Sequence, residues 1–350
     1  MLLCQHPSKG FKTYQCPKCG NIRTIHFNCN GRLCTNCGKR HTDRWAEKVQ
    51  QRLADVSHRH VVFTMPDELW KIIETRKELL NVAFHSIFLT IRDVFYHQCN
   101  KKHHVLPGIL AVLHTYGEDL KFNVHFHCVI TEGGLNDAND WINIPYILYE
   151  SLRKSWQYHL LTSIRKELPE TNENRKVIDR MFTHYLDGFY VRAKDRTPRD
   201  KQDLLRYIAR YIRHPAIAQS RINSFDKGIV SFDCEKDTRG KYTVAMPVQE
   251  FILAIIKHIP EKGFRLVRYM GMYSNSKRKN SLAILSRFRA IVVSLQKKLV
   301  GTQVFCDICG CEMEEMHIQA PTDPPPYLDI RNLIHGNDLI PFIEPDVQSS

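Results

Sequence analysis

Gly108-Ile-Leu-Ala-Val-Leu-His-Thr-Tyr116 and Asn123-Val-His-Phe-His-Cys-Val-Ile-Thr131 are the two runs that decide the fold. Both are rich in β-branched and other apolar residues, and the segment between them carries the turn formers Gly117 and Asp119. Apolar runs of this length, separated by a short polar segment, predict a β-hairpin. We therefore expect an antiparallel pair of strands at the centre of the protein.

The segments on either side of this hairpin alternate between extended and helical patterns. Before it, His60-Val-Val-Phe-Thr-Met65 predicts a strand, Pro66 opens a helix, and an amphipathic helical region runs to about Lys102. After it we expect helix over 143–186, a strand at 188–193, a basic helix at 200–213, a hairpin of 228–234 with 241–246, a helix at 248–258 and a strand at 264–270. This mixture predicts an α+β fold with an antiparallel sheet flanked by helices.

Composition divides the chain into three expected domains. Residues 1–55 are rich in Cys, Gly, Asn and basic residues and poor in apolar runs, so we expect a metal ion to organise them. Residues 56–290 form the expected main domain, enlarged by a helical insertion near 138–186. Residues 291–350 are a C-terminal extension whose Pro-rich tail, after about Ala320, is expected to be loosely ordered.

The charge balance points to a polyanionic partner. The 350 residues include 50 Lys and Arg against 37 Asp and Glu, which gives a formal net charge of +13 and favours nucleic acid. No apolar run approaches the roughly 20 residues of a membrane span. The first nine residues also lack the hydrophobic stretch of a signal peptide, so we expect a cytoplasmic protein with no membrane partner.

Cysteine spacing indicates zinc. Twelve cysteines in a cytoplasmic chain are not expected to form a disulfide framework. Cys16-Pro-Lys-Cys19 and Cys34-Thr-Asn-Cys37 are two knuckle-like pairs that can supply four thiolates to one tetrahedral ion. We predict that Cys16, Cys19, Cys34 and Cys37 bind structural Zn²⁺, with Cys29 and His26 as possible substitutes; the alternative is that the cysteines are buried without a metal.

A third cysteine pair occurs near the end of the chain. Cys306-Asp-Ile-Cys309 lies close to Cys311 and His317. Cys306 and Cys309 are therefore candidates for a second zinc knuckle, or for a site completed by distant residues such as Cys4 and His6. The alternative is a short reduced loop without a metal.

Histidines on the central hairpin form a candidate metal site. Along a strand successive side chains alternate between faces, so His125 and His127 share one face, whereas Phe126 and Cys128 point to the other. His114 is on the preceding strand, at a position whose side chain would lie on the same face once the hairpin forms. Three imidazoles with open coordination positions could hold a divalent ion that polarises a phosphate oxygen; taken alone, the pattern is more often structural.

A basic helix carries two tyrosines. In Leu204-Leu-Arg-Tyr207-Ile-Ala-Arg-Tyr211-Ile-Arg213 the phenols of Tyr207 and Tyr211 are four residues apart and so share a helix face. Arg206, Arg210 and Arg213 add positive charge that could hold DNA phosphates. The simpler interpretation is an amphipathic helix with packed tyrosines and solvated arginines.

Together the metal strand and the tyrosine helix suggest reversible DNA cleavage. A phenol has a pKa of about 10, so its phenolate is a better leaving group than an alkoxide. An enzyme of this kind would cut a DNA strand, keep the 5′ end on tyrosine, and later pass it to a 3′-hydroxyl without ATP.

The order of these motifs resembles the rolling-circle transposases of the IS91 family, within the HUH endonuclease superfamily. The resemblance covers most of residues 12–312. The matching segments are Cys16 through Cys37, His60-Val-Val-Phe-Thr-Met-Pro66, residues 108–130, Arg210-Tyr-Ile-Arg-His-Pro-Ala-Ile-Ala-Gln-Ser-Arg-Ile222 and residues 251–274.

The resemblance assigns roles to the candidate residues. It implies that His125 and His127 bind catalytic Mg²⁺ or Mn²⁺, that Tyr211 is the nucleophile, and that Tyr207 is the second tyrosine of two-tyrosine members. Family members often carry another histidine where this chain has Asn123 and Val124, so His114 is the candidate third ligand, similar to the arrangement of conjugative relaxases. The implied partners are single-stranded or hairpin DNA at transposon ends and target DNA.

Two other functions remain open at this level. A plasmid replication initiator or relaxase would use the same chemistry without integrating its product. A zinc-containing DNA-binding protein without catalysis would need neither the histidines nor the tyrosines.

Overall fold

A computed structural model describes residues 4–29, 31, 34–50, 52–193, 216–236, 240–288 and 304–319. The chain divides into two compact units. A small unit combines residues 1–29 with residues 297–350, and a large unit comprises residues 30–296. In the described part of the chain, no helix has the length and apolar character needed to cross a membrane.

The small unit joins the two ends of the chain in one sheet. Its described strands are β1 (Phe11–Gln15), β2 (Ile22–His26) and β12 (Glu314–Gln319), in the order β12-β1-β2 with antiparallel pairing. A short 3₁₀ helix, η1 (Pro7–Lys9), precedes β1. Residues 1–55 and 291–350 were expected to form separate domains, whereas β1 pairs directly with β12. Pairing between strands so distant in the chain leaves no local sequence signal.

The large unit is built on the predicted hairpin. Among its described residues, six strands form one sheet in the order β11-β4-β5-β3-β7, with β6 added to β5. These strands are β3 (His58–Thr64), β4 (Leu106–Tyr116), β5 (Phe122–Leu135), β6 (Trp141–Asn143), β7 (Val191–Ala193) and β11 (Val267–Gly271). All their pairings are antiparallel, which confirms the predicted α+β class and places β4 and β5 at the centre of the sheet.

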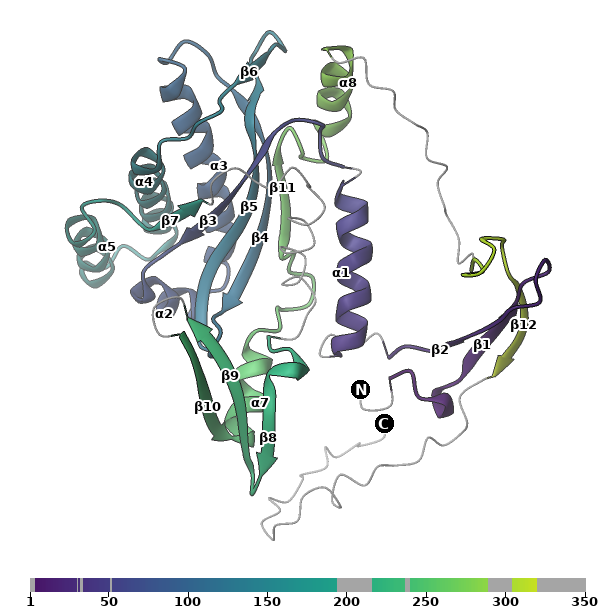
Figure 1. Cartoon of the computed structure of the whole chain (residues 1–350). Helices are drawn as coiled ribbons and strands as arrows, with labels where there is room; N and C mark the ends of the chain where they lie inside the picture. Colours follow the sequence, from purple (N-terminus) through teal and green to yellow (C-terminus); the bar gives the residue numbers. More distant parts are fainter. Residues whose placement is uncertain are drawn as a thin grey trace, which may run out of the picture. The chain divides into compact units, whose positions relative to one another are not determined.

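Helices cover both faces of this sheet (Figure 1). On one face lie α2 (Asp67–Thr75), α3 (Leu79–Gln98), α4 (Tyr149–Glu167) and α5 (Asn172–His184). Buried side chains such as Ile109 and Phe126 pack against this layer, with Phe84 edge-on to Phe126 at 4.9 Å. On the opposite face, α1 (Thr35–Gln50) packs its Ala46 and Val49 against Leu110, Val112 and Val129. Alternation along β4 and β5 thus supplies two apolar surfaces from one hairpin.

A second sheet follows in the large unit. Its described strands are β8 (Ile222–Asp226), β9 (Ile229–Lys236) and β10 (Gly240–Pro247), in the order β10-β9-β8. The 3₁₀ helix η2 (Gln219–Arg221) leads into it, and α7 (Val248–Lys257) and α8 (Arg278–Phe288) follow. Phe232 packs against Phe251 of α7, and Leu120 from the β4–β5 turn joins the same apolar cluster.

A buried ion pair fixes β3 to β5. The Nη2 atom of Arg59 donates to Oε1 of Glu132 at 2.7 Å and to the carbonyl oxygen of Pro145 at 2.9 Å, and its Nε donates to the same Glu132 oxygen at 3.1 Å. The side chains are only 7% and 9% exposed. Removing one partner would therefore leave an uncompensated charge inside the protein.

We predict that Glu132→Ala lowers the free energy of unfolding by about 3–5 kcal/mol, because the Arg59 guanidinium loses its carboxylate in a buried setting. Urea denaturation of the purified protein measures this change. Glu150→Ala is the matched control, since Glu150 makes an ion pair of the same 2.7 Å length with Lys154 on the surface of α4. An equal loss in both variants would contradict a special role for the buried pair.

Candidate functional site

Three histidines meet at one end of the central hairpin. His114 of β4 pairs directly with His125 of β5, and His127 lies two residues further along β5. The ring of His114 has its centroid 5.0 Å from that of His125 and 4.1 Å from that of His127. One nitrogen from each ring lies within 4.8 Å of the others. The arrangement across the hairpin is the one that strand alternation predicts.

Burial shifts the pKa of two histidines of the cluster downward. Burial lowers the pKa of His114 well below its usual 6.5, and the neighbouring imidazoles of His127 and His125 lower this pKa further. Burial also lowers the pKa of His125. Unprotonated imidazole is the form that ligates metals, so the lowered pKa values of His114 and His125 favour cation binding.

Hydrogen bonds orient two of the rings. Nδ1 of His125 donates to the carbonyl oxygen of Asn123 at 3.0 Å, since a carbonyl can only accept. The proton is therefore on Nδ1, and Nε2 of His125 keeps its lone pair for a ligand. His127 uses its Nδ1 in a contact of 3.0 Å with Nε2 of His60.

His60 is a residue of this site that the sequence analysis missed. It lies on β3, is 4% exposed, and stacks on His127 with ring centroids 5.1 Å apart. Its parity on β3 places it on the face of the sheet that carries His127, but this becomes visible only once the pairing of β3 with β5 is known. The sequence 60–65 was interpreted as a strand without a functional side chain.

The other catalytic candidates lie outside the described residues. These are Tyr207 and Tyr211, together with the arginines Arg206, Arg210 and Arg213. Their roles stay predictions from the sequence.

The structure groups the cysteines differently from the sequence prediction. Cys16 and Cys19 meet Cys306 and Cys309 within the small unit, with one sulfur from each within 4.8 Å of the others. Cys34 and Cys37, which were expected to share an ion with the first pair, belong to the large unit, at the start of α1. Spacing along the chain shows that a C-x-x-C pair can supply two ligands, but it does not determine which pair completes the set.

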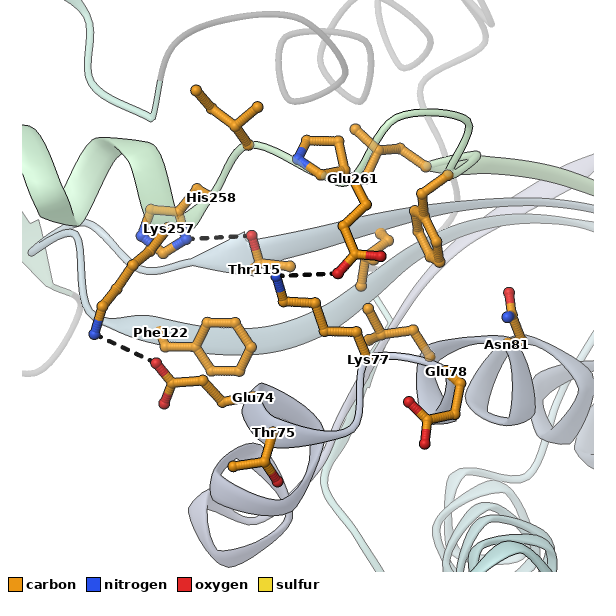
Figure 2. Close-up of a pocket in the computed structure, with 16 residues that line it drawn as sticks. Glu74, Thr75, Lys77, Glu78, Asn81, Thr115, Phe122, Lys257, His258 and Glu261 are labelled. Atoms are coloured by element: carbon orange, nitrogen blue, oxygen red, sulfur yellow. Dashed lines mark hydrogen bonds and ion pairs between the residues drawn. The ribbon is translucent and has the colours of Figure 1, made fainter. Parts of the chain in front are cut away.

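A pocket of about 540 Å³ lies on the other face of the sheet from the histidines. Leu113 and Phe122 line it, together with α2, the start of α3 and the segment after α7 (Figure 2). Two lysines of the pocket are already paired with glutamates, Lys257 with Glu74 at 3.3 Å and Lys77 with Glu261 at 3.4 Å. The charges shown in Figure 2 thus bridge the walls of the pocket, and the histidine cluster remains the better candidate for chemistry.

Two protein-family models match the chain. Residues 108–281, which contain all three clustered histidines, match a family described as "Putative transposase". Residues 1–65 match a model described as "Transposase zinc-binding domain". Together they cover the cysteine-rich start of the chain and most of the large unit.

Curated relatives agree with these matches. The chain is similar to the "Transposase for insertion sequence element IS801" of Pseudomonas savastanoi pv. phaseolicola, with 28% identity over 293 residues, which cover 79% of this chain and 69% of the relative. It is also similar to "Putative transposase y4qJ" of Sinorhizobium fredii (strain NBRC 101917 / NGR234), with 28% identity over 300 residues, which cover 80% and 74%. No solved structure matches the chain significantly.

Proposed function

The chain belongs to the IS91 family of transposases, and from this premise we propose that it moves its insertion sequence by rolling-circle transposition, cleaving and rejoining single-stranded DNA through a 5′-phosphotyrosine intermediate. It is a transposase of an insertion sequence, and thus an enzyme that acts on DNA. Its zinc-binding domain and cysteine cluster support structural zinc.

The observation that carries the proposal is the cluster of His114, His125 and His127. Three imidazoles converge from two strands, and this donor set suits a divalent transition-metal ion with open coordination positions. A bound divalent ion would supply a Lewis acid that polarises a phosphate oxygen. The three side chains themselves would hold that ion in one position at the end of the hairpin.

The donor set also favours Mn²⁺ over Mg²⁺. Within the part of the chain that the structure describes, the group of clustered ligands contains only histidines and no carboxylate. Mg²⁺ prefers oxygen ligands, whereas imidazole nitrogen suits transition metals. Of the two ions expected from the sequence, Mn²⁺ is therefore the better fit.

His60 acts in this proposal as a positioning residue. In this role Nδ1 of His127 donates its proton to Nε2 of His60, so that Nε2 of His127 presents a lone pair to the ion. Partners of this kind orient a metal-binding ring and select its tautomer. His60 would thus do for His127 what the carbonyl of Asn123 does for His125.

Tyr211 is the proposed nucleophile, and Tyr207 the second tyrosine. The phenolate oxygen of Tyr211 attacks phosphorus, the bond to the 3′ oxygen breaks, and the 5′ phosphate stays on the tyrosine. The proton that the phenol loses balances the one that the new 3′-hydroxyl gains. The reverse reaction at another 3′-hydroxyl rejoins the strand, and a second tyrosine lets one enzyme hold one end while it cuts another.

We predict that a labelled single-stranded transposon end forms a covalent adduct with the protein in Mn²⁺, and that Tyr211→Phe reduces the adduct at least about 100-fold because the nucleophile is lost. Denaturing gels measure the adduct. Tyr207→Phe should keep the first cleavage and reduce transfer, and Tyr158→Phe, an exposed tyrosine on α4, is the control. Full adduct in Tyr211→Phe would overturn the assignment, and no adduct in wild type would favour a non-catalytic DNA-binding protein.

We predict that His114→Ala and His125→Ala each weaken Mn²⁺ binding by roughly 10- to 100-fold, and that His60→Ala weakens it about tenfold through His127. Electron paramagnetic resonance titration of free Mn²⁺ measures the affinity. His184→Ala, an exposed histidine at the end of α5, should change nothing. Unchanged affinity in His114→Ala would remove it from the ligand set, and unchanged affinity in His60→Ala would leave it a packing residue.

We predict that binding to single-stranded DNA weakens steeply with salt, because arginines displace counterions from phosphates. A triple variant changes Arg206, Arg210 and Arg213 to Gln. It should reduce the slope of log affinity against log salt by about 2, because each of the three lost phosphate contacts contributes about 0.7. Fluorescence anisotropy across a salt titration measures the slope. Arg180→Gln, exposed on α5, serves as the control, and an unchanged slope in the triple variant would exclude these arginines from the DNA interface.

A further inference from the structure

The small unit contains the same turn twice. Cys16-Pro-Lys-Cys19-Gly20 and Cys306-Asp-Ile-Cys309-Gly310 share one sequence pattern. In each turn the glycine N–H donates to the carbonyl of the first cysteine at 2.9 Å. The N–H of that cysteine in turn donates, at 2.8 Å, to the carbonyl of the residue after the glycine, which is Asn21 or Cys311. The glycines have φ of +70° and +69°, which only glycine adopts readily. Both turns are therefore folded as metal knuckles.

The two turns face each other through their sulfurs. Sγ of Cys16 lies 3.4 Å from Sγ of Cys309, and Sγ of Cys19 lies 3.5 Å from that of Cys306 and 3.6 Å from that of Cys309. Four sulfurs around a tetrahedral zinc ion, with Zn–S of about 2.3 Å, are about 3.8 Å apart. These separations are close to that value and far beyond the roughly 2.05 Å of a disulfide.

Donors around the sulfurs suit a charged thiolate site. The side-chain amide of Asn21 donates to Sγ of Cys306 at 3.5 Å. Backbone groups of Ile308 and Cys309 also hydrogen-bond to Cys306. Donors of this kind offset the negative charge that four thiolates bring to one ion.

The described residues of the small unit form only a small apolar core. Among them, the buried cluster consists of Tyr14, Cys16, Cys306 and Met313, so half of its buried members are cysteines. Small units with so little core usually depend on a metal or a disulfide for stability.

We infer that Cys16, Cys19, Cys306 and Cys309 bind a single structural zinc ion that joins the two ends of the chain. Four thiolates from two knuckles make a closed tetrahedral site, which leaves no position for a substrate. The match to the transposase zinc-binding domain ends at residue 65, so half of these ligands lie outside it. The site is independent of the proposed strand transfer, because its ligands and its test do not involve DNA cleavage.

Zinc stoichiometry of the full-length protein tests whether the pairs share one ion. Two double variants are compared, Cys16→Ser with Cys19→Ser and Cys306→Ser with Cys309→Ser. Each should lose the same single equivalent of zinc, measured by inductively coupled plasma mass spectrometry. The quadruple variant should lose no more than either double variant. Cys311→Ser, beside the second knuckle, should keep its zinc. Full zinc in the Cys306 and Cys309 variant, or a loss in the quadruple variant twice that of each double, would overturn the inference.

Alkylation of wild-type protein gives a readout that needs no variant to fold. Cys19 is exposed, so burial does not protect it from N-ethylmaleimide. Peptide mass spectrometry should show Cys19, Cys306 and Cys309 becoming reactive together when a chelator removes zinc, with a rate for Cys19 that rises about tenfold or more. Rapid alkylation of Cys19 while all the zinc stays bound would contradict the proposed site.

Discussion

Alternation of side chains along β4 and β5 is the constraint on which the large unit depends. Because successive residues point to opposite faces, one hairpin sends Ile109 and Phe126 into the layer of α3 and α4, and sends Leu110 and Val129 toward α1. His114, His125 and His127 lie on the same face as Leu110 and Val129, nearer to the turn between β4 and β5. A shift of one residue in register would exchange the two faces and turn the imidazoles toward α3 and α4, so the register that packs the hairpin also assembles the histidine cluster.

Local sequence signals predicted much of this arrangement. The hairpin, the α+β class and the shared face of His114, His125 and His127 all follow from runs and parity within about 25 residues of chain. His60 did not, because its contact with His127 requires the pairing of β3 with β5 across 67 positions. Side-chain roles that arise from distant strands have no periodicity by which the sequence could reveal them.

The grouping of the cysteines also depends on pairing between distant strands, which the sequence does not reveal. Each C-x-x-C pair, with its following glycine, was recognisable as a zinc knuckle, but proximity in the sequence favoured joining Cys16 and Cys19 to Cys34 and Cys37. The partners in the small unit come instead from Cys306 and Cys309, 287 to 293 residues away. Thiolates carry no complementarity that selects one pair over another, so the strand pairing of β1 with β12 decides the set.

The pairing of β1 with β12 makes the large unit an insertion within the small one, and this affects the order in which the protein can fold on the ribosome. Residues 30–296 are contiguous and can fold as they emerge, whereas β1 must wait for its second partner strand, β12, which begins at Glu314. At synthesis rates of about 5–20 residues per second, that delay is roughly 15–60 s. Throughout it the first knuckle is present without its partner, so the nascent chain displays two thiols that a competing metal could bind before β12 arrives.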